Sequence, residues 1–137
     1  MVDDATAAYI VENQRCFEDL KQVAAQLAGM LVLAASGSKE ALPDHPALRS
    51  ARAIFREANV SVLRARPTEL AKLHHAHLTK AAAAIGTALS HATNVLNVDP
   101  ILIPLRAGYS ELEQAADALP GFEKVSYDRA CCGVRLQ

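Results

Sequence analysis

Apolar residues return at every third or fourth position over most of the chain, which is the spacing of one face of an α-helix. The first such stretch predicts a helix over residues 4–36, which begins after an acidic N-cap and ends at a Ser-Gly-Ser turn. Its apolar stripe includes Ile10, Phe17, Leu20, Ala24, Leu27, Leu31 and Ala34. The same spacing predicts three further helices, over residues 45–66, 68–97 and 100–119.

Prolines mark the ends of these helices. Asp44 is the expected N-cap of the second helix, and Pro46 is tolerated in its first turn. Pro67 disfavours helical backbone at the residue before it, so we expect a break there, with one continuous kinked helix as the alternative. The Asp-Pro pair at 99–100 predicts the start of the fourth helix, and Pro104 is expected to bend or delay that start.

Beyond the fourth helix, the pattern changes. Residues 120–137 open with Pro-Gly, and around Val125 and Tyr127 apolar and polar positions alternate, which indicates extended chain. A length of 137 residues is that of one domain, and we find neither an internal repeat nor a long linker. The sequence therefore predicts one all-α domain over residues 1–137, an antiparallel up-and-down four-helix bundle with a short extended C-terminal tail.

Composition and charge exclude several classes of protein. The chain is 51% hydrophobic and 4% aromatic, which excludes disorder and disfavours an all-β domain. Its net charge of −1 gives no general attraction for nucleic acid or an anionic membrane, and no apolar run approaches the roughly 18 residues of a membrane span. An odd cysteine count of 3 and an acidic N-terminus without signal-peptide character favour the reducing cytoplasm.

The unequal lengths of the predicted helices suggest self-association. The first and third helices are longer than the others, so part of their apolar surface lacks cover unless the tail supplies it or a homodimer buries it. Alanines at 81–84, followed by Ala88 and Ala92, would let a neighbouring backbone approach closely. Gly29 and Gly86 lie inside predicted helices and off the main stripe, which favours a close crossing with another chain, or simple solvent exposure.

The histidines are the polar residues that point most directly to chemistry. Four of the 5 lie on the predicted third helix, at His74, His75, His77 and His91. On a helical wheel His74 and His77 fall inside the apolar arc, and two imidazoles on one face can share a metal ion. The expected partner ligands, on the first helix, are Glu12, Cys16 or Asp19. Because no paired metal motif accompanies them, hydrogen-bonded structural histidines are the alternative, and no other cofactor is predicted.

The segment His77-Leu78-Thr79-Lys80-Ala81 resembles the His-x-x-Lys-Gly motif of histidine phosphotransfer domains, which are four-helix bundles of similar size. The resemblance implies that His77 accepts a phosphoryl group and that Lys80 offsets its charge. It covers about five residues. This sequence departs from the motif at Ala81, where the family has glycine, and at Thr79, where an apolar residue is usual.

The adjacent pair Cys131 and Cys132 is a candidate redox or thiolate site. Neighbouring residues are too close for an ordinary disulfide, and the spacing is not that of a zinc or thioredoxin motif. Arg129 and Arg135 would lower a thiol pKa if the tail is exposed, whereas simple packing of two small apolar side chains is the alternative.

Enzyme signatures such as a glycine-rich phosphate loop or GxSxG are absent from the sequence. We therefore predict a small cytoplasmic interaction module, non-enzymatic and homodimeric, whose partner surface involves the alanine strip or the tail. The competing hypotheses are a phosphotransfer-like bundle with His77 as acceptor, and a metal- or small-ligand-binding bundle that uses His74 and His77. Neither nucleic acid nor a membrane is an expected partner.

Overall fold

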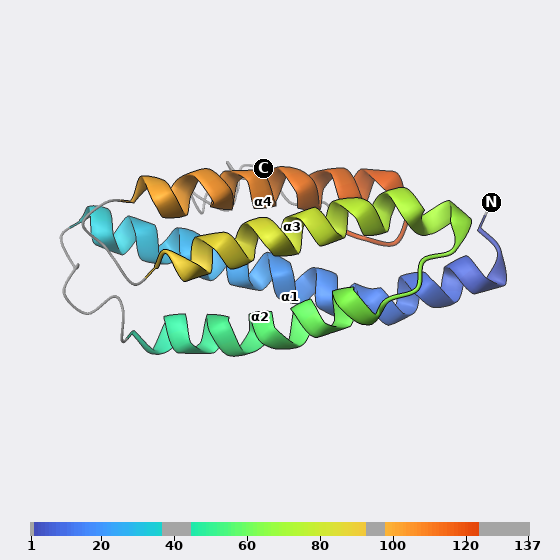
Figure 1. Cartoon of the computed structure of the whole chain (residues 1–137), viewed down its shortest axis with the longest axis horizontal. Helices are drawn as coiled ribbons and strands as arrows, with labels where there is room; N and C mark the ends of the chain where they lie inside the picture. Colours follow the sequence, from blue (N-terminus) through green and yellow to red (C-terminus); the bar gives the residue numbers. More distant parts are fainter. Residues whose placement is uncertain (1, 37–44, 93–97, 124–137) are drawn as a thin grey trace, which may run out of the picture.

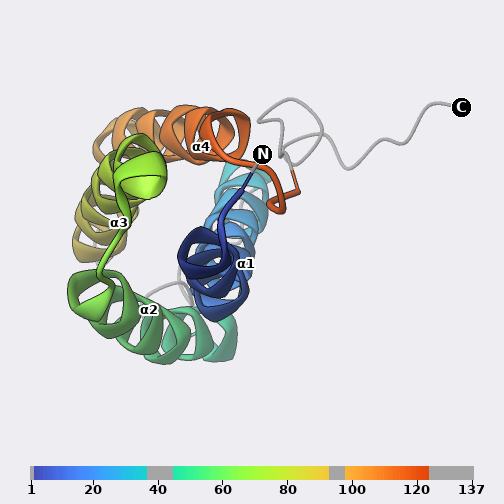
Figure 2. The same ribbon diagram turned by 90° about the vertical axis from the view of Figure 1, so that its right-hand side faces the viewer.

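The chain folds as the predicted four-helix bundle. The computed structural model describes residues 2–36, 45–92 and 98–123. Its helices are α1 (Asp4–Ala35), α2 (Pro46–Arg64), α3 (Lys72–Ser90) and α4 (Asp99–Ala118), with a 3-10 turn, η2 (Glu69–Ala71), before α3. The helices run alternately in opposite directions (Figure 1) and surround a common centre when viewed along the bundle (Figure 2). The described residues contain no strand, and residues 124–137 of the predicted tail lie outside them.

The first helix is the longest element. Asp3 caps it by accepting a hydrogen bond from the backbone N–H of Thr6 at 2.8 Å, which satisfies one of the free donors of the first turn. α1 has 32 residues, whereas α2 and α3 have 19 each and α4 has 20. In Figure 1 α1 extends past its neighbours at both ends. Of the two long helices that the sequence predicts, only the first is therefore long.

The predicted third helix, 68–97, is too long at both ends. Thr68 has extended backbone (ψ 173°), and the tight turn η2 precedes the first regular turn of α3. At the other end Arg52 of α2 donates a hydrogen bond to the carbonyl oxygen of Leu89 at 3.2 Å. This contact adds a side-chain donor to a carbonyl of the last turn, and α3 ends at Ser90.

The proline predictions are confirmed at Pro46, at Pro67 and at the start of the fourth helix, whereas the delay expected from Pro104 is not seen. Pro46 lies in the first turn of α2, and the helix ends before Pro67. The cap of α2 is His45, whose Nδ1 accepts from the N–H of Ala47 at 3.0 Å, while Asp44 lies outside the described residues. Pro104 does not delay α4, which begins at Asp99 and continues through it. Pro104 lies in the second turn of α4. Its missing N–H therefore removes a single backbone hydrogen bond near the start of that helix.

Small residues allow the helices to approach closely. The closest helix pairs are α3 with α4 and α1 with α2. A Cβ added at Gly108 of α4 would lie 2.8 Å from Cγ1 of Ile85, and one added at Gly86 of α3 would lie 2.9 Å from Cζ of Phe55. The crossing that we predicted at Gly86 is thus made within the chain, not with a second one. Gly29 has no other group within 4 Å of its added Cβ.

The alanine strip also serves the core of this chain. Ala81, Ala88 and Ala92 are all buried, together with the large side chains of the bundle interior. Ala83 is exposed and Ala84 is half-buried, so only part of the strip that the sequence suggested as a partner surface is covered within the chain. No helix among the described residues has the length and apolar character needed to cross a membrane.

Candidate functional site

His74 lies in the core, as the helical wheel predicts. Its side chain is 0% exposed, and Nδ1 lies 2.9 Å from the hydroxyl oxygen of Tyr9 on α1. The imidazole stacks on the ring of Phe122, with centroids 4.0 Å apart. Nε2 has no hydrogen-bond partner within the described part of the chain. Burial, with smaller effects of the charges of His75 and His77, lowers the pKa of His74 to about 4. His74 is therefore neutral at pH 7.

Tyr9 is the polar partner of this buried imidazole. Burial, and secondarily the charge of Cys16, raises the pKa of the Tyr9 phenol well above its ordinary value. The phenol is therefore protonated, and the contact is a hydrogen bond between two neutral groups that joins α1 to α3. A neutral, buried and stacked imidazole fits the structural alternative that we set beside a metal site for His74.

His77 lies at a different place, on the edge between α3 and α4. Its side chain is 16% exposed, and Nδ1 lies 2.7 Å from Oε1 of Glu111, whose side chain is 23% exposed. A carboxylate can only accept, so Nδ1 carries the proton and donates it to Glu111. This hydrogen bond fixes the ring and leaves Nε2 as the nitrogen that carries the lone pair when the imidazole is neutral.

The surface beside His77 is partly cationic and partly apolar. Lys80 follows one turn later on α3 and is exposed, and it makes no ion pair with the described residues. Leu73, one turn earlier, is 60% exposed, although a leucine is usually buried. Ala81, at the position where the phosphotransfer motif has glycine, is fully buried, so its methyl group does not stand above the surface.

The predicted metal ligands are not brought together. His74 faces Tyr9 on α1, whereas His77 faces Glu111 on α4. Cys16 is buried, and burial raises the pKa of its thiol to about 11, so the thiol stays protonated at pH 7. Within residues 2–36, 45–92 and 98–123, no three His, Cys, Asp or Glu side chains are grouped so as to hold a metal ion.

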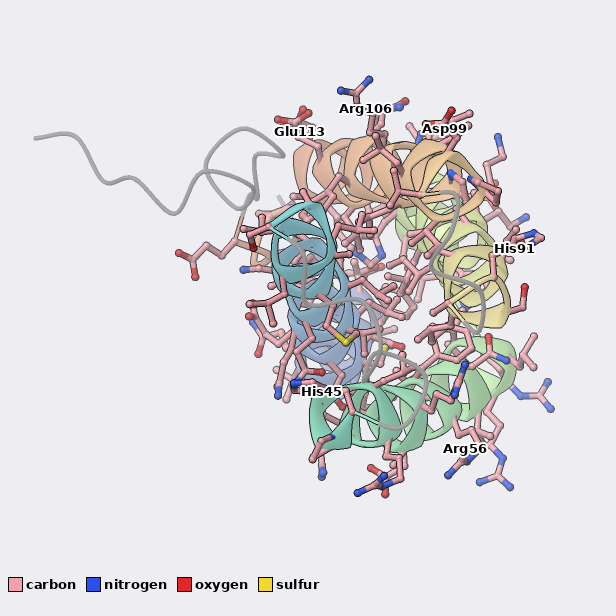
Figure 3. All side chains as sticks on the ribbon, turned by 90° about the vertical axis from the view of Figure 1, so that its left-hand side faces the viewer. His45, Arg56, His91, Asp99, Arg106 and Glu113 are labelled. Atoms are coloured by element: carbon pink, nitrogen blue, oxygen red, sulfur yellow. The ribbon has the colours of Figure 1, made fainter. Side chains whose placement is uncertain are left out.

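Two of those predicted ligands instead line a groove between α1 and α2. Cys16 and Asp19 border it from α1, and its volume is about 560 Å³. Its remaining lining residues are Arg15, Arg56, Glu57, Val60 and Ser61. The Arg15 guanidinium lies 3.9 Å from both Asp19 and Glu57, so charges of both signs are balanced there. In Figure 3 Arg56 points away from α2 and from the bundle.

The remaining residues singled out from the sequence are Glu12, His75, His91, Cys131 and Cys132. Glu12 is exposed on α1, and His75 lies beside α2 with Nε2 3.0 Å from the carbonyl oxygen of Val62. Figure 3 shows His91 on the outside, at the end of α3. Cys131 and Cys132 lie outside the described residues.

Comparisons of the chain with protein-family models, with curated proteins and with solved structures give no match.

Proposed function

We propose that this helical bundle is a phosphoacceptor module in which Nε2 of His77 takes up the phosphoryl group. The observation that supports this most directly is the 2.7 Å hydrogen bond from Nδ1 of His77 to Glu111. A partly exposed imidazole with one nitrogen held by a carboxylate is arranged as a nucleophile. His74, which has no exposure, is not.

The chemistry follows from this arrangement. The lone pair on Nε2 of neutral His77 attacks the phosphorus of a phosphoryl donor, such as an acyl phosphate on a partner protein. The N–P bond forms as the bond from phosphorus to the leaving oxygen breaks, and that oxygen keeps the electron pair. The ring then carries a positive charge, which the Glu111 carboxylate stabilises through Nδ1–H. The ammonium of Lys80, one turn along the helix, offsets the negative charge of the phosphoryl oxygens.

The test is phosphoryl uptake from phosphoramidate, a small donor that needs no partner protein, followed by intact mass. We expect wild-type protein to gain one phosphoryl group and His77→Gln to gain none. Glu111→Gln should slow uptake about tenfold, because a neutral amide replaces a charge-assisted hydrogen bond. His75→Gln is the matched control and should react like wild type. Uptake by His77→Gln at the wild-type rate would overturn the proposal.

A second candidate is the homodimeric interaction module that the sequence suggests. It is favoured by Val32 and Leu33, which are 51% and 43% exposed. Both lie near the end of α1, which extends past its neighbouring helices. A homodimer and a cytoplasmic location are compatible with the phosphoacceptor proposal, and both stay predictions.

A further inference from the structure

The chain that follows α4 turns back along the neighbouring helix α1 (Figure 2). After Ala118 the residues Leu119–Glu123, which we call the latch, leave α4 and pass beside α1 (Figure 2). Leu119 and Phe122 are 5% and 8% exposed, so both side chains are buried by this path. The latch thus covers a part of the core that the four helices leave open.

Its polar attachments to α1 lie at the surface. Nε2 of Gln14 donates a hydrogen bond to the carbonyl oxygen of Gly121 at 2.8 Å. Nζ of Lys21 lies 3.5 Å from the carbonyl oxygen of Glu123 and 3.9 Å from its carboxylate. Exposed hydrogen bonds and ion pairs of this kind compete with water and hold a segment weakly.

The buried attachment consists mainly of one ring. Phe122 stacks on the imidazole of His74 with centroids 4.0 Å apart, and it meets Phe17 edge-on at 5.1 Å. The turn that delivers it depends on Gly121, which has a φ of +102° that side chains disfavour. A Cβ there would also lie 2.6 Å from Cγ2 of Ile10. The closed latch therefore rests on the buried side chains of Leu119 and Phe122 and on the turn at Gly121.

We propose that the latch opens as a local unit while the four helices stay folded, and that opening uncovers the imidazole of His74. A segment with few buried contacts and exposed hydrogen bonds opens at a smaller free energy than the whole domain. The uncovered ring offers Nε2, which has no hydrogen-bond partner among the described residues.

The experiment labels accessible histidines of the full chain with diethyl pyrocarbonate and locates each modified residue by fragment-ion mass spectrometry, which separates His74 from His75 and His77 on the same peptide. Exposed His91 is the internal reference. Phe122→Ala and Gly121→Ala should raise the rate at His74 about tenfold or more, because each disfavours the closed latch, and leave His91 unchanged. The matched control is Gly29→Ala, where the added methyl group meets nothing within 4 Å, and its His74 rate should equal that of wild type.

The wild-type protein alone also decides the question. The slowest-exchanging backbone amides report how often the whole protein unfolds. The modification rate of His74 should require an opening that occurs more often than this global unfolding. If His74 reacts only as often as the whole bundle unfolds, or if either latch variant unfolds all four helices, the latch is part of the common core and the proposal is wrong. None of these readouts involves His77, so the outcome is independent of the phosphoacceptor test.

Discussion

Two histidines three positions apart on one helix have opposite surroundings, and these decide what each can do. His74 is enclosed by Tyr9 and Phe122 and has no charged partner, so its neutral form is favoured. His77 meets the carboxylate of Glu111 at the edge of the bundle, and there a positive charge on the ring is stabilised. The helical wheel placed both residues on one apolar arc. A spacing of 100° per residue identifies the buried face of a helix, but it does not separate the centre of that face from its edge.

The buried imidazole predicts how stability depends on pH. The pKa of His74 is about 4 in the folded protein and lies near its ordinary value of 6.5 when the chain unfolds. The unfolded chain therefore binds the proton more readily, and stability falls as pH is lowered from 6.5 toward 4. The loss should total about 3 kcal/mol.

Urea unfolding at a series of pH values measures this loss. The variant His74→Phe has no imidazole to protonate at this position. The free energy of unfolding of wild type should therefore fall relative to that of the variant as the pH is lowered through that window. His91→Gln, which removes an exposed imidazole, should follow wild type. Parallel pH profiles for wild type and His74→Phe would show that His74 does not titrate as described.

Gly108, at a helix crossing, and Gly29, in open space, predict opposite effects of a substitution by alanine. At Gly108 an added methyl group would lie 2.8 Å from Ile85, so Gly108→Ala should destabilise the protein by about 1 kcal/mol or more through overpacking. Gly29→Ala adds a methyl group in open space and should stabilise α1 by about 0.5–1 kcal/mol through helix propensity. Thermal and urea unfolding of both variants against wild type measure the two changes. Equal effects would mean that α3 and α4 are not in the close contact described.

The sequence could predict the helices but not how they face one another. Apolar spacing located α1 and α4 almost to the residue, because their stripes are bounded by a cap or by a Pro-Gly stop. The end of α3 was missed, since Ala92 and Leu96 continue its apolar period while Arg52, which satisfies the last turn, belongs to another helix. Glu111 was missed for the same reason. Its pairing with His77 depends on the register of α3 against α4, which one sequence does not contain.

At the scale of the molecule, the long first helix is the feature that the described part of the chain does not fully cover. We expect wild-type protein to sediment as a dimer, with Leu33→Lys shifting it toward monomer because a charge would enter the buried contact. Leu63→Lys is the control, since Leu63 is an exposed leucine on α2 and is 71% exposed already. Sedimentation velocity over a concentration series measures both. A wild-type protein that stays monomeric throughout would contradict the homodimer and leave the phosphoacceptor proposal untouched.

In the phosphoacceptor proposal, the bundle as a whole would hold the imidazole of His77 in a fixed place. α3 and α4 are in close contact through Gly108 and the alanines, so the hydrogen bond between His77 and Glu111 links two elements that are held in a fixed register. Preorganisation of this kind lowers the cost of positioning a nucleophile. It also explains why the site needs no loop: both side chains project from regular helices.

The most direct measurement is NMR of nitrogen-15-labelled wild-type protein after reaction with phosphoramidate, with phosphorus-31 spectra recorded on the same sample. We predict a single phosphoryl group, bonded to Nε2 of His77, with Nδ1 still protonated toward Glu111. A phosphoryl group on Nδ1, a distribution over several histidines, or no uptake at all would contradict the role that we assign to this pair.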